Sequence, residues 1–246
     1  MSKPKSTPSI EATRVTDQGD WQVGATPRSG AMPAGAGRSG SWVSTGTEVW
    51  TEAERDTLAA EFRATLQRRV HGLCFSPYLE GQQPGDPIGE AQIRERLQII
   101  RPHTGWVRSF SCTDGHEQTP RIAHELGFKT LVGAWLGTDA AINEREIQGV
   151  IDVARAGHAD IVAVGNEVML REDMSEDALL GFIQRVKDAL PGVPVGYVDA
   201  YFLFEKHPRI TAACDVVMTN CYPFWEGCPR EQALAYICLL YTSRCV

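Results

Sequence analysis

The chain has 246 residues, of which 43% are hydrophobic and 22% are charged, with a formal net charge of −7 and a pI near 5.4. This composition is that of an ordinary globular protein, and its acidic balance disfavours a nucleic acid or another polyanion as partner, whereas a neutral polysaccharide is compatible with it. No stretch has the length and apolar content of a signal-peptide core or a transmembrane segment, and the sequence leaves the compartment open.

Residues 1–49 are rich in Gly, Pro, Ser and Thr and lack sustained apolar periodicity, which predicts a flexible tail. A helix is predicted next, over residues 51–70, because Thr51 and Glu54 have the spacing of a capping box. Its apolar residues share one face: Leu58, Phe62, Leu66 and Val70. We expect this helix to cover the bottom of the following domain or to lead into its first strand.

Short apolar runs then alternate with amphipathic helical segments. The runs cover residues 72–78, 105–110, 129–136, 161–164, 193–197 and 216–221. Two of the intervening segments show clear helical spacing and begin at capping residues, one at Thr138 or Asp139 and the other at Ser175. Alternating β and α elements predict a parallel sheet.

Polar and aromatic side chains follow the apolar cores of these runs at the same end. They are Tyr78, Arg108, Trp135, Asn166, Glu167, Asp199 and the segment 220–225. Strands arranged in a ring around one pocket would place them so, and a (β/α)8 barrel therefore fits better than an open doubly wound sheet. No dinucleotide or phosphate-loop motif follows a strand. The predicted fold class is α/β, a (β/α)8 barrel of which about six βα units are present.

The fourth run ends in Gly165, Asn166 and Glu167, so that an amide stands beside a carboxylate at the end of a buried strand. In a barrel this end opens into the site where catalytic groups lie, which makes Glu167 a candidate acid/base. A glutamate that only caps the following loop is the alternative interpretation. This motif alone does not separate the two.

Five motifs follow one another along the predicted strands. They are Cys-Phe-Ser-Pro-Tyr at 74–78, Val-Arg-Ser-Phe at 107–110, Val-Gly-Ala-Trp-Leu-Gly at 132–137, Val-Gly-Asn-Glu at 164–167 and Asn-Cys-Tyr-Pro-Phe-Trp at 220–225. In this order and spacing they resemble glycoside hydrolase family 17, the β-1,3-glucanase family, in its bacterial and fungal branch. The resemblance runs from about His71 to Gln232. It implies a partial (β/α)8 glycosidase domain over residues 50–237 that acts on β-1,3-glucan and needs no cofactor.

The resemblance also implies a retaining mechanism, in which one carboxyl group protonates the glycosidic oxygen and then activates the attacking hydroxyl. Glu167 would be this acid/base. Asn166 would hydrogen-bond the sugar 2-hydroxyl, and Tyr222 would orient the nucleophilic carboxylate. The alternatives are an amide that satisfies loop backbone for Asn166 and a core tyrosine for Tyr222.

Aromatic side chains at strand ends are candidates for a sugar platform, because the C–H faces of pyranose rings pack on aromatic faces. Arg108 would support the catalytic carboxylates electrostatically, and Asp199 would accept a hydrogen bond in the pocket wall. Core packing, an ordinary surface position and a loop role are the respective alternatives. The predicted substrate-binding residues are Tyr78, Arg108, Trp135, Tyr197, Asp199, Phe224, Trp225 and Glu226.

The nucleophile of this family, a glutamate in a Glu-Thr-Gly-Trp-like run after a seventh strand, has no match in the 246 residues. Glu226 follows the sixth strand, and we assign it to subsite contacts or a loop instead. Residues 238–243, Cys-Leu-Leu-Tyr-Thr-Ser, look like the translation of a transposase adapter used in DNA library preparation. We therefore expect residues 238–246 to be non-biological and the seventh and eighth strands to be missing.

The sequence thus predicts a retaining glycoside hydrolase or transglycosylase acting on β-1,3-glucan, with this fragment itself inactive. The alternative is a non-catalytic carbohydrate-binding barrel, which would keep the aromatic platform and dispense with paired carboxylates. A glutamate at the end of the seventh strand would favour the enzyme. A metal-dependent enzyme would need convergent ligands, and the histidines show no clustering in sequence, so no metal is predicted.

Overall fold

The computed structural model describes residues 14–15, 21–22, 51–228 and 232–244. The chain divides into two compact units, Glu48–Asn220 and a second unit made of Met1–Thr47 and Cys221–Val246. The predicted flexible tail over residues 1–49 lies outside the described residues, except for two short antiparallel strands, β1 (Arg14–Val15) and β2 (Trp21–Gln22).

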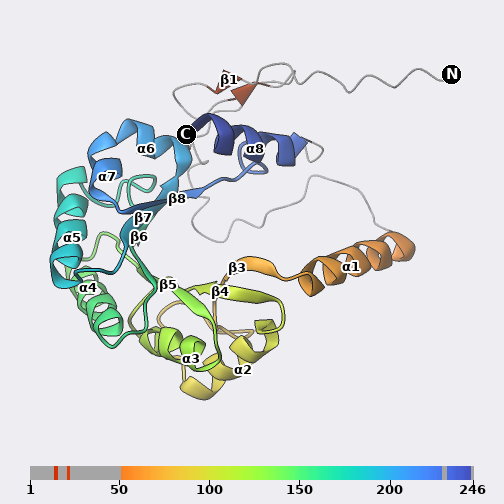
Figure 1. Ribbon diagram of the computed structural model, residues 1–246, viewed down its shortest axis with the longest axis horizontal. Helices are drawn as coiled ribbons and strands as arrows, with labels where there is room; N and C mark the ends of the chain where they lie inside the picture. The colour runs from red at the N-terminus through yellow and green to blue at the C-terminus, as the bar shows by residue number, and fades with distance from the viewer. Residues whose placement is uncertain (1–13, 16–20, 23–50, 229–231, 245–246) are drawn as a thin grey trace. The chain divides into compact units, whose positions relative to one another are not determined.

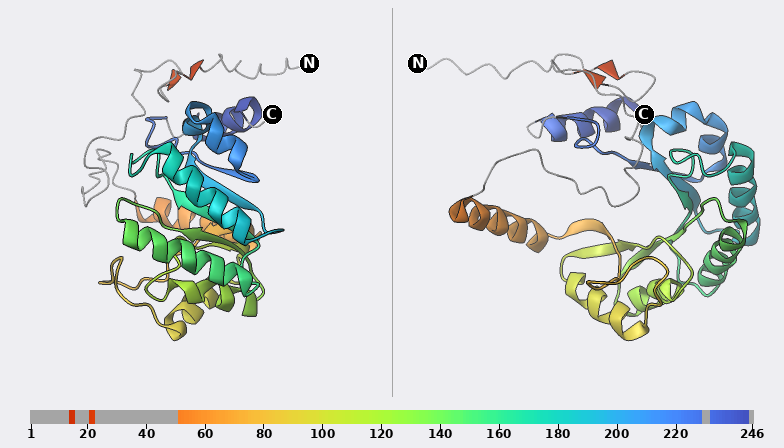
Figure 2. Two further views of the ribbon diagram at one scale, coloured as in Figure 1. Left: turned by 90° about the vertical axis from the view of Figure 1, so that its left-hand side faces the viewer. Right: turned by 180° about the vertical axis from the view of Figure 1, so that it is seen from behind.

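The unit Glu48–Asn220 is built on one sheet of six parallel strands whose order in the sheet is their order in the chain. They are β3 (Val70–Cys74), β4 (Thr104–Arg108), β5 (Lys129–Ala134), β6 (Ile161–Asn166), β7 (Val195–Ala200) and β8 (Val216–Asn220). The six predicted strands are confirmed. Figures 1 and 2 show the strands on the inner side of a curve and the helices on its outer side, so the prediction of an incomplete (β/α)8 barrel is confirmed as well.

Helices, two of them capped by a side chain at their first turn, connect the strands. They are α2 (Glu90–Ile100), the short 3-10 turn η1 (His116–Gln118), α3 (Thr119–Glu125), α4 (Ala140–Arg155), α5 (Glu176–Ala189), α6 (Tyr201–Lys206) and α7 (Pro208–Ala213). The Asp139 carboxylate accepts hydrogen bonds from two backbone amides at the start of α4, and the Ser175 hydroxyl accepts one at the start of α5. Both predicted caps are confirmed, and each satisfies amides that the first helical turn leaves without partners.

The core lies between the sheet and its outer helices. Val162 and Val164 of β6 pack in one buried cluster with Ile147 of α4 and Ile183 of α5. A second cluster joins β4 to α2 and α3. Burying each of these side chains contributes about 1.5–3 kcal/mol to folding. The strands are therefore fixed from their outer face, and their carboxyl ends can carry polar groups.

Helix α1 (Glu52–Gln67) begins with the predicted capping box, in which Thr51 and Glu54 exchange side-chain and backbone hydrogen bonds. It has no buried residue, and Phe62 on its apolar face is 67% exposed. The helix leads into β3 through a turn in which Arg69 takes a φ of 61°. Of the two placements expected for this helix, the structure shows the lead into the first strand.

In the second unit the structure describes the segment 221–228 and helix α8 (Ala233–Arg244). Residues 238–244 lie within this helix, so the proposed boundary at residue 238 falls inside an element. The domain boundaries therefore stay a proposal. None of the helices in the described part of the chain combines the length and hydropathy needed to cross a bilayer.

Candidate active site

Strand β6 ends in a bulge that turns its last residues away from the regular ladder. Ala163 pairs with Gly196 and Asn166 with Val198, so β6 has one more residue than β7 over this stretch. Gly165 lies in the bulge with a φ of 91°, and a Cβ there would stand 2.8 Å from a methyl group of Val168. Only glycine adopts this backbone without strain. Bulges re-aim side chains beside active sites, and this one sets the direction of Asn166 and the residue after it.

Glu167 follows the bulge in a left-handed conformation, with a φ of 55°. Its amide donates to the carbonyl of Val198 at 2.8 Å, and its Oε1 accepts a hydrogen bond from Nδ2 of Asn220 at 2.7 Å. Asn220 is the last residue of β8, so the carboxyl ends of two strands meet at this half-buried carboxyl group. The sequence interpretation gave Asn220 no role of its own, although an amide that ends an apolar strand is the signal that marks it.

Arg108, at the end of β4, binds the neighbouring amide. Its Nη2 donates to Oδ1 of Asn166 at 2.6 Å, and its guanidinium carbon lies 4.5 Å from the centroid of the Phe110 ring. Asn166 is buried. The structure therefore brings together three predicted site residues, Arg108, Asn166 and Glu167.

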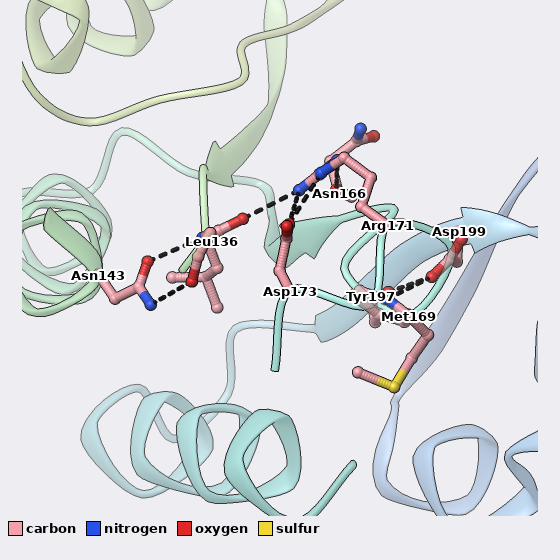
Figure 3. Close-up of polar contacts among 9 residues, drawn as sticks. Leu136, Asn143, Asn166, Met169, Arg171, Asp173, Tyr197 and Asp199 are labelled. Carbon is pink, nitrogen blue, oxygen red and sulfur yellow. Dashed lines mark hydrogen bonds and ion pairs between the residues drawn. The ribbon is translucent and has the colours of Figure 1, made fainter. Parts of the chain in front are cut away.

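Tyr197 and Asp199 of β7 lie in the interior, where they are 1% and 0% exposed (Figure 3). The Tyr197 hydroxyl donates to the Asp199 carboxylate, and the Met169 amide donates to that hydroxyl at 2.9 Å and to Oδ2 of Asp199 at 3.2 Å. Burial, with a smaller contribution from the charge of Glu167, raises the pKa of Asp199 to about 6. Burial and the adjacent carboxylate also raise the pKa of Tyr197.

The predicted sugar-platform role of Tyr197 and pocket-wall role of Asp199 do not fit side chains without exposed surface. Strand β7 is buried on both faces, so its polar residues turn toward protein. They bind the backbone of Met169, in the turn that follows Glu167. We correct their assignment to support of that turn.

Trp135 follows β5 and is 40% exposed. Its amide donates to the buried Glu146 carboxylate of α4 at 3.1 Å. The same carboxylate accepts hydrogen bonds from the hydroxyls of Ser111 and Thr113 and from the amide of Cys112. Glu146 thus joins the segments after β4 and β5. Its signal in the sequence is a carboxylate on the apolar face of an amphipathic helix.

Tyr78, in the loop after β3, is half-buried and pairs with His116. Its hydroxyl lies 2.9 Å from Nε2 of that histidine, and the two rings meet edge to face at 5.1 Å. Burial raises the pKa of Tyr78 and lowers the pKa of His116, which favours a neutral imidazole. Nothing in these contacts joins Tyr78 to Glu167.

The remaining predicted site residues belong to the second unit and are described by themselves. The rings of Tyr222 and Trp225 lie 6.3 Å apart, Phe224 is exposed, and Glu226 accepts a hydrogen bond from the Tyr236 hydroxyl. Within the residues that the structure describes, no three His, Cys, Asp or Glu side chains converge as metal ligands.

A parallel β/α half-barrel that gathers an amide, a carboxyl group and an arginine at the carboxyl ends of its strands has the arrangement of the (β/α)8 barrel class, whose functional groups lie at that end. The chain belongs to the BtgE/BtgC glycoside hydrolase domain family, whose model matches residues 72–241. The predicted membership of glycoside hydrolase family 17 is confirmed.

Curated relatives and a solved structure agree with this assignment. The chain is 24% identical over 144 residues to the glucan 1,3-beta-glucosidase of Schizosaccharomyces pombe, which covers 53% of this chain and 45% of that protein. It is 27% identical over 148 residues to glucan 1,3-beta-glucosidase BGL2 of Candida albicans, with 53% and 48% covered. The chain thus spans about half the length of these relatives.

Among solved structures, the family 17 beta-1,3-glucanosyltransferase from Rhizomucor miehei aligns with a TM-score of 0.62 at 21% identity. The alignment covers 72% of this chain and 66% of that one. This likeness shows that the two chains share a fold.

Proposed function

We propose that this chain is part of a retaining glycoside hydrolase or transglycosylase that acts on β-1,3-glucan, with Glu167 as the acid/base. The observation that carries the proposal is the position of Glu167. It stands at the bulged carboxyl end of β6, beside Asn166, with its carboxyl group held by Asn220. The names of the curated relatives and of the aligned transferase support a β-1,3-glucan as substrate.

In this mechanism Glu167 gives its proton to the glycosidic oxygen while a second carboxylate attacks the anomeric carbon and the leaving sugar departs. Glu167 then takes a proton from water or from a sugar hydroxyl, which displaces the second carboxylate. Asn220 contributes by fixing one carboxyl oxygen, so that the proton can reside on the other. No residue of the chain is assigned as the nucleophile, and we propose that it lies outside these 246 residues.

The neighbours of Glu167 would bind the sugar. Because Arg108 occupies Oδ1 of Asn166, the Nδ2 group is the donor that a sugar 2-hydroxyl would meet. The half-exposed Trp135 offers a ring face for stacking. For the second unit we keep the predicted roles: Tyr222 orients the nucleophile, Phe224 and Trp225 stack on sugars, and Glu226 contacts a subsite. Tyr78 stays a candidate platform residue.

A carbohydrate-binding barrel without catalysis is the second candidate. One observation favours it, since the 246 residues contain no match to the strand-end glutamate that would complete the pair. Such a protein would bind laminari-oligosaccharides through the same aromatic rings. It would not turn them over.

The test uses a protein extended beyond β8 by the two further βα units of a complete (β/α)8 barrel. Glu167→Ala should slow hydrolysis of laminari-oligosaccharides by about 10²–10⁴-fold, because the leaving sugar must then depart unprotonated. Glycosylation by an activated aryl glucoside, whose leaving group needs little protonation, should lose much less. Glu172→Ala is the matched control, since Glu172 is exposed and also has a positive φ.

Two results would count against the assignment. Equal losses on both substrates, with deglycosylation shown not to limit the rate, would remove Glu167 from the acid role. Binding of laminari-oligosaccharides by the extended wild-type protein without any turnover would favour the carbohydrate-binding barrel.

A further inference from the structure

Arg171 lies in the turn after β6 and has no part in the reaction described above. Its side chain reaches back over the ends of two neighbouring strands (Figure 3). Nη1 donates to the carbonyl of Asn166 at 2.6 Å, and Nη2 donates to the carbonyl of Leu136 at 3.0 Å. Asn166 ends β6, and Leu136 lies just beyond the end of β5. One side chain therefore bridges the carboxyl ends of two adjacent strands.

The same guanidinium is held on two further sides. Nε donates to Oδ2 of Asp173 at 2.8 Å, and Nη2 lies 2.7 Å from the same oxygen. The guanidinium carbon of Arg171 lies 4.8 Å from the centroid of the Trp135 ring. A planar guanidinium can stack on an aromatic face while its edge donates to carbonyl and carboxylate oxygens, whereas a lysine ammonium cannot do both.

The backbone of Arg171 also takes part in the turn that carries the acid/base. Its amide donates to the carbonyl of Glu167 at 3.0 Å. Backbone and side chain of Arg171 therefore bind two consecutive residues, Asn166 and Glu167, from the same turn. The left-handed φ of Glu167 makes this turn intrinsically strained, so contacts that hold it decide where the carboxyl group points.

We propose that Arg171 is a positioning residue. It fixes the Asn166–Glu167 end of β6 and the Trp135 ring relative to each other, so that a sugar stacked on Trp135 meets the amide and the carboxyl group in register. The identity of the sugar rests on the proposed function. The tie between the strand ends, by which we mean the hydrogen bonds from Arg171 to the carbonyls of Asn166 and Leu136, does not depend on that function.

Hydrogen exchange of the purified 246-residue chain, followed by mass spectrometry, tests the tie without any sugar. Arg171→Lys keeps the charge but removes the planar guanidinium that bonds both carbonyls. The amides of residues 134–137 and 167–170 should therefore exchange about 5-fold faster. Amides of residues 162–164 should keep their rates. Arg185→Lys is the matched control, because Arg185 pairs with Glu144 at an exposed site on the outer helices. Wild-type rates in both Arg171→Lys and Arg171→Gln would overturn the proposal.

Isothermal titration with laminari-oligosaccharides tests the positioning. Arg171→Lys and Trp135→Ala should each weaken binding by about 5-fold. The double variant should bind no more weakly than the weaker single variant, because both changes remove the same stacked pair. Losses from general destabilisation would instead add.

The outcomes separate this proposal from the proposed function. A wild-type chain that binds no laminari-oligosaccharide overturns the proposed ligand, and with it the sugar part of this inference, while the exchange rates still decide the tie. A wild-type chain that binds, beside an Arg171→Lys chain that binds equally well, overturns the positioning role and leaves the proposed function standing.

Discussion

Glu167 is held in a conformation that its own backbone does not favour. A positive φ at a residue other than glycine costs about 1–3 kcal/mol and persists only where the surroundings determine it. Here the surroundings are hydrogen bonds with β7 and β8: Val198 accepts from the Glu167 amide, and Asn220 donates to its carboxyl group. The stored strain is consistent with selection for a direction of this side chain rather than for stability.

The buried Asp199 should make stability depend on pH in a direction unusual for a carboxylate. Its folded-state pKa, about 6, lies above the ordinary value of 3.8, so the folded protein binds more protons than the unfolded chain between these values. The free energy of unfolding should therefore fall as pH rises from 4 to 7, by about 2 kcal/mol relative to Asp199→Asn. Urea unfolding of both proteins at each pH measures this difference.

Asp188→Asn serves as the control, since Asp188 is an exposed residue of α5. The difference between wild type and this control variant should not show the same decline. A difference between wild type and Asp199→Asn that stays flat from pH 4 to 7 would contradict the raised pKa of Asp199.

Single side chains at strand ends could be predicted, whereas their partners could not. Arg108, Asn166 and Glu167 each follow an apolar run, and that position is visible in the sequence. Tyr197 and Asp199 also belong to a strand, β7, but the sequence does not tell whether this buried strand turns them toward a pocket or toward a neighbouring loop. That choice depends on Met169, which comes from another element.

At the scale of elements, periodicity and capping predicted the six strands and the starts of three helices, because these signals are local. The bulge in β6 was not predicted. Pairing registers on β7 define it, and these involve residues more than thirty positions away. The local sequence signal of this bulge is a single glycine within an apolar strand, Gly165.

Replacing the bulge glycine should damage the strand end more than the strand. Gly165→Ala combines a positive φ with a contact of 2.8 Å to Val168, so it should lower the free energy of unfolding by about 3 kcal/mol. Gly181→Ala in α5 is the matched control. A Cβ there meets no atom within 4 Å, and alanine should stabilise the helix by about 0.5–1 kcal/mol. Chemical denaturation of the three proteins measures both changes, and equal stability of wild type and Gly165→Ala would show that the bulge relaxes freely.

At the scale of the whole molecule, the site depends on strands that lie side by side in the sheet or two positions apart. Glu167 of β6 is held by β7 and β8, and Arg108 of β4 reaches across β5 to Asn166. Polar contacts thus join the strands at their carboxyl ends, while apolar clusters pack on the outer face of the sheet. Order along the chain equals order in the sheet, so motifs found in sequence order become neighbours in space.

The two edge strands of this sheet should make the chain prone to self-association. Within the described part of Glu48–Asn220, β3 pairs only with β4 and β8 only with β7, and Val217 of β8 is 39% exposed. An edge strand that carries exposed apolar side chains is a template for another chain. We expect the 246-residue protein to form oligomers or aggregates in size-exclusion chromatography with light scattering, and Val217→Lys to shift it toward the monomer, because a charge on an edge strand opposes pairing. Ile142→Lys is the matched control, since Ile142 is equally exposed, at 40%, but lies on α4. A monodisperse wild-type protein, or an equal effect of both lysine substitutions, would contradict the role of the edge strand.

The 246-residue protein should also show no turnover of laminarin, because Glu167 has no assigned nucleophile with which the covalent intermediate could form. Turnover that disappears in Glu167→Ala would show that a carboxylate within these 246 residues serves as the nucleophile.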